Sequence, residues 1–511
     1  MTMKVKIPML ENEVWYGGYV YGSEKMPLDQ SEKILVDFYL NRTPNQGSPL
    51  LLSNKGRYLW DDGGFCAEFA DGEICLDKEV PLQEGRNDLK GAYLDAMENH
   101  FPFRDIHLDR AFFSKPVYNT WIELTFNQNE KDILRYASDI LANGMPAGIL
   151  MIDDGWSDYY GKWTFNRERF PHAEEMIDKL HQMGFQVMLW VCPYVTPDTV
   201  VYREALKNGY LIMQNGEEPF ILKWWNGYSA ALDLSNPEAV QWLDQQFQDL
   251  CEMGIDGFKF DAGDSSYYNE QSVNGKQRNK GNISPNEMCR LWCLYGEKYR
   301  MNEFRAAWRV GGHSIMQRLC DKPHSWSEGG VQALIPDVLA QGILGMPFGC
   351  PDMIGGGEYL NFQENSENLD EELFVRHAEI ACLMPVMQFS AAPWRVLKKE
   401  NFERIKTSIA VREKYLDYLL TCAEDAARTG EPMVRYMEYE FPHQGMEKVK
   451  TQFMLGSKML VAPVCEKGQN GRSVIIPEGS WDFEGEVIVG DGKAHVLHTE
   501  MGKPAILWKM N

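Results

Sequence analysis

Two aspartates in this sequence stand where a pair of acids could cleave a glycosidic bond. Asp261 ends the apolar run 257–260 and is followed by Gly263, so a strand delivers a carboxylate into a turn that can bend close to a ligand. Asp321, 60 residues further along, belongs to a second polar segment. Cleavage with retention of configuration needs one ionised nucleophile and one protonated acid, with their carboxyl groups about 5 Å apart.

Asp261 is the better candidate for the nucleophile. Lys259 lies two residues earlier on the same strand face and would supply a positive field that keeps the carboxylate ionised. A strand-end aspartate is also a common turn cap. The position of Asp261 after an apolar strand, with a glycine two residues later, favours the catalytic interpretation.

Asp321 is the candidate for the acid. Leu319 and Trp326 would give it apolar surroundings, and an ionised carboxylate nearby would further favour its protonated form. The alternative is an ordinary loop aspartate that forms an ion pair with Arg318 or Lys322. The spacing alone leaves both interpretations open.

Other residues near predicted strand ends have side chains that suit sugar recognition. Aromatic rings pack on the C–H faces of sugars, and carboxylate or guanidinium groups can form bidentate hydrogen bonds with neighbouring hydroxyls. Most single tryptophans are core residues, and an aspartate in a glycine-rich turn often fixes that turn, an interpretation slightly favoured for Asp352. The candidates for substrate contact are Asp153, Asp154, Trp190, Trp225, Lys259, Arg309, Trp326 and Asp352.

The elements that must position these residues alternate between apolar strands and helical segments from about residue 115 onward, which indicates parallel βα units. Polar residues gather just after the strands, and no GxGxxG phosphate loop supports an open sheet. The segments therefore predict a closed (β/α)8 barrel, with helices such as 173–181 between strands. The expected strands are 120–126, 148–154, 186–191, 257–261, 305–310, a segment leading into 325–327, 346–350 and 385–390.

Two further β regions enclose this segment in the sequence. Short alternating stretches such as 33–40, broken by Gly, Asn and Pro, predict an N-terminal β-sandwich over residues 1–112. The barrel is expected over 113–424. Segments such as 452–464 predict a C-terminal β-sandwich over 425–511.

The composition of the chain limits the classes of partner that we expect the protein to bind. A net charge of −23 disfavours nucleic acid and anionic membranes and suits a small neutral substrate. The N-terminal residues do not resemble a signal peptide and no apolar run reaches about 18 residues, so we expect a cytoplasmic protein that could also form a homo-oligomer. Eleven scattered cysteines indicate reduced thiols, and no metal-ligand pattern or cofactor motif is present.

Together the motifs resemble glycoside hydrolase family 31, from about residue 115 to the C-terminus. The segment 257–264 is similar to the family's nucleophile strand, 342–356 to its strand-seven signature, and 152–156 with 163–170 to its acidic loop. The resemblance implies that Asp261 is the nucleophile, Asp321 the acid/base, and that Asp153 or Asp154 holds the distal hydroxyls of the sugar. It also implies a substrate-binding arginine, Arg309 or alternatively Arg305.

Departures from the family pattern bear on the substrate. The segment 319–322 replaces the Trp-x-Gly-Asp loop typical of its α-glucosidases, and 388–390 replaces their final-strand histidine. These segments look closer to a branch with animal and bacterial members in which α-galactosidase activity is known. We therefore expect a retaining α-glycosidase acting on an α-galactoside or an α-glucoside. The alternatives are a transglycosidase and a catalytically silent sugar-binding protein.

Overall fold

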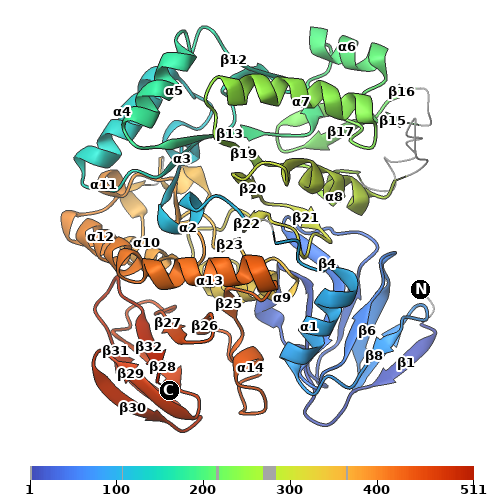
Figure 1. The fold of residues 1–511 in the computed structure, drawn as a ribbon, viewed down its shortest axis with the longest axis vertical. Coiled ribbons are helices and arrows are strands. Elements are labelled where there is room, and N and C mark those ends of the chain that lie inside the picture. The colour runs from blue at the N-terminus through green and yellow to red at the C-terminus, as the bar shows by residue number, and fades with distance from the viewer. Residues whose placement is uncertain (1–2, 106, 215–217, 269–282, 364–365, 511) are drawn as a thin grey trace. The chain divides into compact units, whose positions relative to one another are not determined.

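The computed structural model describes residues 3–105, 107–214, 218–268, 283–363 and 366–510 (Figure 1). The chain divides into two compact units. The first unit contains Met1–Tyr39, Asn45–Ser114 and Arg309–Asn511, and the second contains Leu40–Pro44 and Lys115–Trp308.

The N-terminal region consists of antiparallel sheets, as the alternating sequence predicts. In the strand β3, Val36 is buried while its neighbours are more exposed, which is the period-two pattern of a half-buried strand. One sheet has the order β1 (Val5–Pro8), β7 (Glu73–Leu76), β6 (Cys66–Ala70), β3 (Ile34–Asp37). A second contains β2 (Trp15–Tyr19), β4 (Gln46–Ser53), β5 (Tyr58–Trp60) and β8 (Leu82–Gln83).

The central fold is a (β/α)8 barrel, preceded in the chain by the N-terminal β-sandwich and followed by a C-terminal β domain. The barrel strands are β9 (Val117–Asn119), β10 (Ile149–Ile152), β13 (Gln186–Val191), β19 (Gly257–Phe260), β20 (Asn302–Phe304), β22 (Met316–Arg318), β23 (Gly349–Cys350) and β24 (Gln388–Phe389). In the second unit, β10 pairs in parallel with β9 and β13, and β19 pairs in parallel with β13 and β20. In the first unit, β22 pairs in parallel with β23.

Two expected strands were misplaced. The first strand ends at Asn119 and not at residue 126, because the Asn119 side chain accepts the backbone N–H of Trp121 at 2.8 Å and the chain turns into α3 (Trp121–Leu124). The fifth strand is β20, which ends before 305–310. There the chain leaves the barrel sheet because the Arg305 side chain is held by carboxylates described below.

Helices lie between consecutive barrel strands, except between β20 and β22, where the described chain has the strand β21 (Ala307–Trp308) and no helix. In α4 (Glu130–Ala142), the residues Ile133, Ala137 and Ile140 recur at helical spacing and are buried, and Asn129 caps the first turn by accepting the N–H of Asp132. The expected helix 173–181 is confirmed as α5 (Ala173–Gln182). The longer helices are α1 (Leu89–His100), α4 (Glu130–Ala142), α5 (Ala173–Gln182), α6 (Val200–Asn208), α7 (Pro237–Glu252), α8 (Pro285–Gly296), α9 (Leu334–Ile343), α10 (Glu371–Ala381), α12 (Lys399–Lys414) and α13 (Leu416–Thr429).

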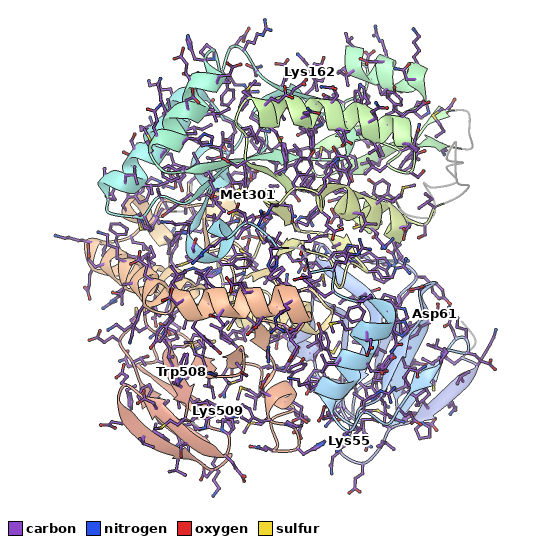
Figure 2. The ribbon with its side chains drawn as sticks, in the orientation of Figure 1. Lys55, Asp61, Lys162, Met301, Trp508 and Lys509 are labelled. Carbon is purple, nitrogen blue, oxygen red and sulfur yellow. The ribbon has the colours of Figure 1, made fainter. Side chains whose placement is uncertain are left out.

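The C-terminal β domain has its own apolar core, which includes Met454, Leu460, Trp481 and Leu507. Side chains of β32, among them Trp508 and Lys509, are labelled in Figure 2. The larger sheet has the order β25 (Val434–Arg435), β26 (Phe453–Leu455), β27 (Met459–Ala462), β32 (Ala505–Lys509), β29 (Gly479–Phe483), β30 (Glu486–Gly490). A separate pair is formed by β28 (Gly471–Ile475) and β31 (Ala494–His498).

Within the described ranges, no helix has both the length and the apolar character needed to cross a membrane.

Candidate active site

Asp261 follows β19 directly and is buried. Its backbone N–H donates to the carbonyl of Val191 at 2.9 Å, which extends the parallel pairing of β19 with β13 by one residue. Its Oδ2 accepts the indole Nε1–H of Trp190 at 3.0 Å, and its Oδ1 accepts the N–H of Ala262 at 2.8 Å. The carboxylate is therefore oriented by donors from two neighbouring strand ends.

Two cations lie beside this carboxylate. Nε of Arg305 donates to Oδ1 of Asp261 at 2.9 Å, and Nζ of Lys259 lies 3.8 Å from Oδ2. The terminal nitrogens of Arg305 hold Asp264 in a two-pronged contact at 2.9 and 2.6 Å. Burial opposes the Arg305 charge, but Asp264 and Asp261 outweigh it and raise the pKa of Arg305. This arrangement stabilises a negative charge at Asp261.

Gly263 has a φ of +71°, and a Cβ at this position would lie 2.7 Å from the ring of Trp292. The glycine is thus required both by its backbone conformation and by close packing against a buried aromatic ring. Its N–H donates to the hydroxyl of Tyr194 at 3.1 Å. The turn after Asp261 is fixed by these contacts.

Asp153 and Asp154 follow β10, and their carboxylates have different hydrogen-bond partners. Oδ2 of Asp153 accepts Nζ of Lys259 at 2.7 Å, and its Oδ1 accepts the N–H of Asp154 at 2.9 Å. Oδ2 of Asp154 accepts the hydroxyl of Tyr160 at 2.8 Å and the Nδ2 of Asn226 at 2.7 Å. Lys259 therefore links Asp153 to Asp261, whereas Asp154 is hydrogen-bonded to two uncharged side chains.

The surroundings of Asp154 change its acidity. Burial raises the pKa of Asp154 to about 7, although the hydrogen bond from Tyr160 opposes the shift. Asn226 Nδ2 also lies 2.8 Å from the Tyr160 hydroxyl oxygen, so the three polar groups form a closed triangle. Near neutral pH this carboxyl can exchange between acceptor and donor of hydrogen bonds.

Aromatic rings surround these acids. Trp190 stacks with Trp224 at 6.4 Å between centroids, and Tyr160 packs against both rings. Trp225 is 48% exposed, and the guanidinium of Arg305 lies 5.1 Å from its ring centroid. An exposed tryptophan next to buried acids offers the flat apolar surface that a sugar face requires.

Asp321 follows β22 in the first unit. Its side chain is 46% exposed, and its Oδ1 accepts Nη1 of Arg318 at 2.9 Å. The same nitrogen donates to Asp352 at 2.7 Å, and the other oxygen of Asp352 accepts the N–H of Lys322 at 2.7 Å. The ion pair with Arg318 that the sequence left open is thus present. Asp352, whose φ is +64°, holds the segment after β22 by its buried carboxylate.

The remaining candidates have other partners. Arg309 forms an ion pair with Asp62 at 2.7 Å and belongs to the first unit. Nε1 of Trp326 donates to Asp370 at 2.9 Å. Arg305, which the sequence offered only as the alternative to Arg309, is the arginine that contacts Asp261.

Tyr160 and Asn226 were missed as site residues. Neither belongs to a strand-end motif, since Tyr160 lies in the turn between β11 (Ser157–Tyr159) and β12 (Lys162–Phe165), and Asn226 in that between β17 (Ile221–Trp224) and β18 (Gly227–Ala231). The tryptophans close to these two residues were the only sequence feature that could have pointed to them as site residues. Among the residues that the structure describes, no group of three or more His, Cys, Asp and Glu side chains could hold a metal ion.

Comparison with known proteins identifies the family. The barrel carries, at its strand ends, a buried carboxylate bound by cations among aromatic rings, which is an arrangement typical of barrel enzymes that act on sugars. The model of the glycosyl hydrolases family 31 TIM-barrel domain matches residues 111–422, and that of the family 31 C-terminal domain matches residues 430–506. The chain belongs to glycoside hydrolase family 31.

Relatives in this family act on various substrates. The mouse myogenesis-regulating glycosidase is 31% identical over 402 residues, which cover 76% of this chain and 54% of that protein. Alpha-glucosidase 2 of Bacillus thermoamyloliquefaciens is 25% identical over 404 residues, 73% of this chain and 50% of that protein. The chain thus spans about half the length of these curated relatives.

Solved structures show the same fold. A Flavobacterium johnsoniae GH31 dextranase complexed with glucose has a TM-score of 0.85 at 18% identity, covering 99% of this chain and 66% of that one. A cycloalternan-forming enzyme from Listeria monocytogenes, in complex with a pentasaccharide substrate, has a TM-score of 0.82 at 20% identity, covering 99% and 53%.

Proposed function

We propose that this chain is a retaining, exo-acting α-glycosidase that removes a terminal α-linked hexose from oligosaccharides or glycosides. Asp261 attacks the anomeric carbon and forms a glycosyl–enzyme ester, while Asp321 gives its proton to the leaving oxygen. Asp321 then takes a proton from the water that attacks the ester, which releases the sugar and restores Asp261. The configuration at the anomeric carbon is retained.

The observation that carries the proposal is the set of contacts of Asp261. A carboxylate nucleophile must be ionised and oriented, and Arg305, Lys259 and Trp190 all contact this one buried side chain. A turn-capping aspartate would not need two cations. Arg305 takes the role that the sequence assigned to Arg309 or Arg305, and Trp225 supplies the sugar platform.

The substrate is a neutral hexoside, either an α-galactoside or an α-glucoside. Lys259 and Arg305 are already paired with the carboxylates of Asp153, Asp261 and Asp264, which favours a neutral sugar over one that carries its own negative charge. The loop 319–322 supports an α-galactoside, whereas Alpha-glucosidase 2 among the relatives supports an α-glucoside. We propose a cytoplasmic location, where the eleven cysteines of the chain would stay reduced.

The first test compares initial rates on nitrophenyl α-glucoside and nitrophenyl α-galactoside. We expect turnover of at least one, and loss on the order of 10⁴-fold in Asp261→Ala. Asp158→Ala, an exposed aspartate beside Lys162, is the matched control and should keep the wild-type rate. Binding of both glycosides without turnover by the wild-type protein would instead identify a silent sugar-binding protein.

A second test separates the roles of the two acids. In Asp321→Ala we expect a loss of about 10²- to 10⁴-fold that added azide partly restores, because a small anion needs no general base. The product would be the α-glycosyl azide, which reports two inversions. Isolation of a new oligosaccharide as the main product of the wild-type enzyme would identify a transglycosidase.

A further inference from the structure

A cavity of about 670 Å³ lies within the first unit, between the helix α12 and the C-terminal sheet. One wall comes from α12 (Lys399–Lys414) and Tyr415, and the other from residues in and beside β29 and β32, between Asp482 and Gly485 and between Lys503 and Trp508. This volume is in the range of small-molecule sites. No residue of the candidate active site lines it, and nothing in the function proposed above uses it.

Part of the lining is apolar. Val411 and Pro504 are buried, whereas Ile506 and Trp508 line the same cavity and are partly exposed. The ring of Trp508, which is labelled in Figure 2, packs edge-on against the ring of Tyr418, with 4.7 Å between their centroids. A partly exposed indole that the protein holds in place offers the flat apolar surface on which the C–H face of a sugar ring can pack.

Three charged side chains of the lining are without an ion-pair partner. Within the part of the chain that the structure describes, the side chains of Lys414, Asp482 and Glu484 form neither an ion pair nor a hydrogen bond. The ammonium group of Lys414 lies 4.9 Å from the ring centroid of Tyr415. The hydrogen-bonding capacity of these three groups is therefore open to a ligand.

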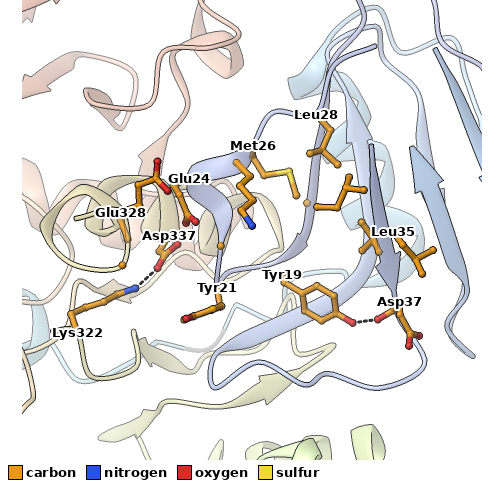
Figure 3. A pocket seen from close by; sticks show the side chains of 17 residues that line it. Tyr19, Tyr21, Glu24, Met26, Leu28, Leu35, Asp37, Lys322, Glu328 and Asp337 are labelled. Carbon is orange, nitrogen blue, oxygen red and sulfur yellow. Dashed lines mark hydrogen bonds and ion pairs between the residues drawn. The ribbon is translucent and has the colours of Figure 1, made fainter. Parts of the chain in front are cut away.

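A second cavity of the first unit differs in this respect (Figure 3). It is lined by residues between Gly17 and Asp37 and between Lys322 and Asp337. There Nζ of Lys322 donates to Asp337 at 2.5 Å, and the hydroxyl of Ser23 donates to the same buried carboxylate at 2.6 Å. The buried charges of that cavity are already satisfied by the protein, whereas the charged groups of the cavity beside α12 are not.

The charges of the cavity beside α12 favour a neutral ligand. Two ammonium groups and two carboxylates line it, from Lys414, Lys503, Asp482 and Glu484. Lys414 belongs to the helix wall and both carboxylates belong to the sheet wall. A ligand there must accept hydrogen bonds from one wall and donate them to the other, without a net charge that either wall would repel. The hydroxyl groups of a neutral sugar do both.

We propose that this cavity is a second carbohydrate-binding site, which holds a neutral sugar unit of a polysaccharide apart from the bond that is cleaved. The indole of Trp508 packs on the C–H face of the sugar. Asp482 and Glu484 accept its hydroxyl groups, and Lys414 donates to a hydroxyl oxygen. The site binds without reacting, so it goes beyond the proposed function and does not require it.

The test separates binding at the cavity from binding at the active site. Native gel electrophoresis through dextran or galactomannan measures polysaccharide binding by retardation, with Asp261→Ala as the parent so that neither polymer is cut. We expect at least one polymer to retard the parent, and Trp508→Ala to weaken its binding about fivefold. In the chain with Asp261 restored, Trp508→Ala should keep the wild-type rate on nitrophenyl glycosides. Trp225→Ala should show the opposite pattern, with retardation kept and the rate lowered.

The matched control is Trp242→Ala, which removes another partly exposed indole, on α7, and should leave retardation unchanged. Thermal melting checks that each variant is folded. Asp482→Ala provides a second test that leaves the contact between Trp508 and Tyr418 in place, and we expect it to weaken binding about threefold.

Retardation of the parent by neither polymer would overturn the proposal. It would also be overturned if retardation were unchanged in both Trp508→Ala and Asp482→Ala, or if it were lost in Trp225→Ala, since the active site would then be what binds the polymer. Absence of all turnover of nitrophenyl glycosides by the wild type would instead refute the proposed function and leave the gel experiment to decide on the second site.

Discussion

Arg318 contacts Asp321 and Asp352 through the same nitrogen, Nη1, at 2.9 and 2.7 Å. Asp352 is fully buried and shares the positive charge of Arg318. Arg318 thus holds the partly exposed carboxyl group of Asp321 in place, and Arg318 is itself anchored by a buried carboxylate.

Asp352→Asn should lower the rate by loosening the segment that carries Asp321. One carboxylate oxygen of Asp352 accepts Nη1 of Arg318 and the other accepts the N–H of Lys322, and an amide side chain keeps only one of these two acceptors. We expect a loss of about tenfold in kcat/KM on the nitrophenyl glycoside, because the carboxyl group of Asp321 is then held less precisely. The control is Glu379→Gln, which changes a buried carboxylate bound to Arg376 at 2.7 Å and should keep the wild-type rate. An unchanged rate in Asp352→Asn would refute this role.

Gly357→Ala should impair the acid without unfolding the protein. A Cβ at residue 357 would lie 2.6 Å from both Cβ and Cγ of Asp321, so the carboxyl group must move. Misplacement by about 1 Å can cost roughly 10²-fold in rate. Gly329→Ala is the matched control, because a Cβ there meets nothing within 4 Å. Rates on the nitrophenyl glycoside and melting curves would be compared; equal rates in both variants would count against Asp321 as the acid.

Arg305→Met and Arg309→Met should differ sharply in their stability and in their activity. Arg305 is buried against Asp261 and Asp264, and its removal takes the guanidinium partner from Asp264 and leaves Asp261 with Lys259, at a cost of about 3–5 kcal/mol in the free energy of unfolding. Arg309 pairs with an exposed Asp62, so its removal should cost less than about 1 kcal/mol. Urea unfolding measures both, and activity should be lost only in Arg305→Met. The reverse order would restore Arg309 as the substrate arginine.

Asp154→Asn should make stability less dependent on pH. The pKa of Asp154 is raised from 3.8 to about 7 in the folded protein, so between these values the folded state binds more protons than the unfolded state. The wild type therefore loses stability as pH rises from about 4 to about 7, by roughly 4 kcal/mol at most from this group. Asp154→Asn should lack this loss, whereas Asp158→Asn, at an exposed site, should not change it. Urea unfolding at pH 5 and pH 8 distinguishes the two.

Much of the fold could be predicted because its signals are local. The strand 186–191 and the helix 173–181 appear as expected, since apolar period and capping residues act within a few residues of chain. The errors lie at strand ends. The strand expected at 120–126 lies instead at Val117–Asn119, and residues 121–124 form a helix, because the Asn119 side chain accepts the backbone N–H of Trp121. The apolar pattern of the sequence does not show this contact.

Sequence alone determined the family, the (β/α)8 barrel and the two candidate acids, because these depend on residue types at short, recognisable spacings. Tertiary structure decided which charges meet. Arg305 and Arg309 are only four residues apart, yet one contacts Asp261 and the other Asp62. Asn226 reaches Asp154 across 72 residues of chain. The packing of strands and loops determines which side chains become partners. The sequence alone does not give the spatial distance between two residues that are far apart along the chain.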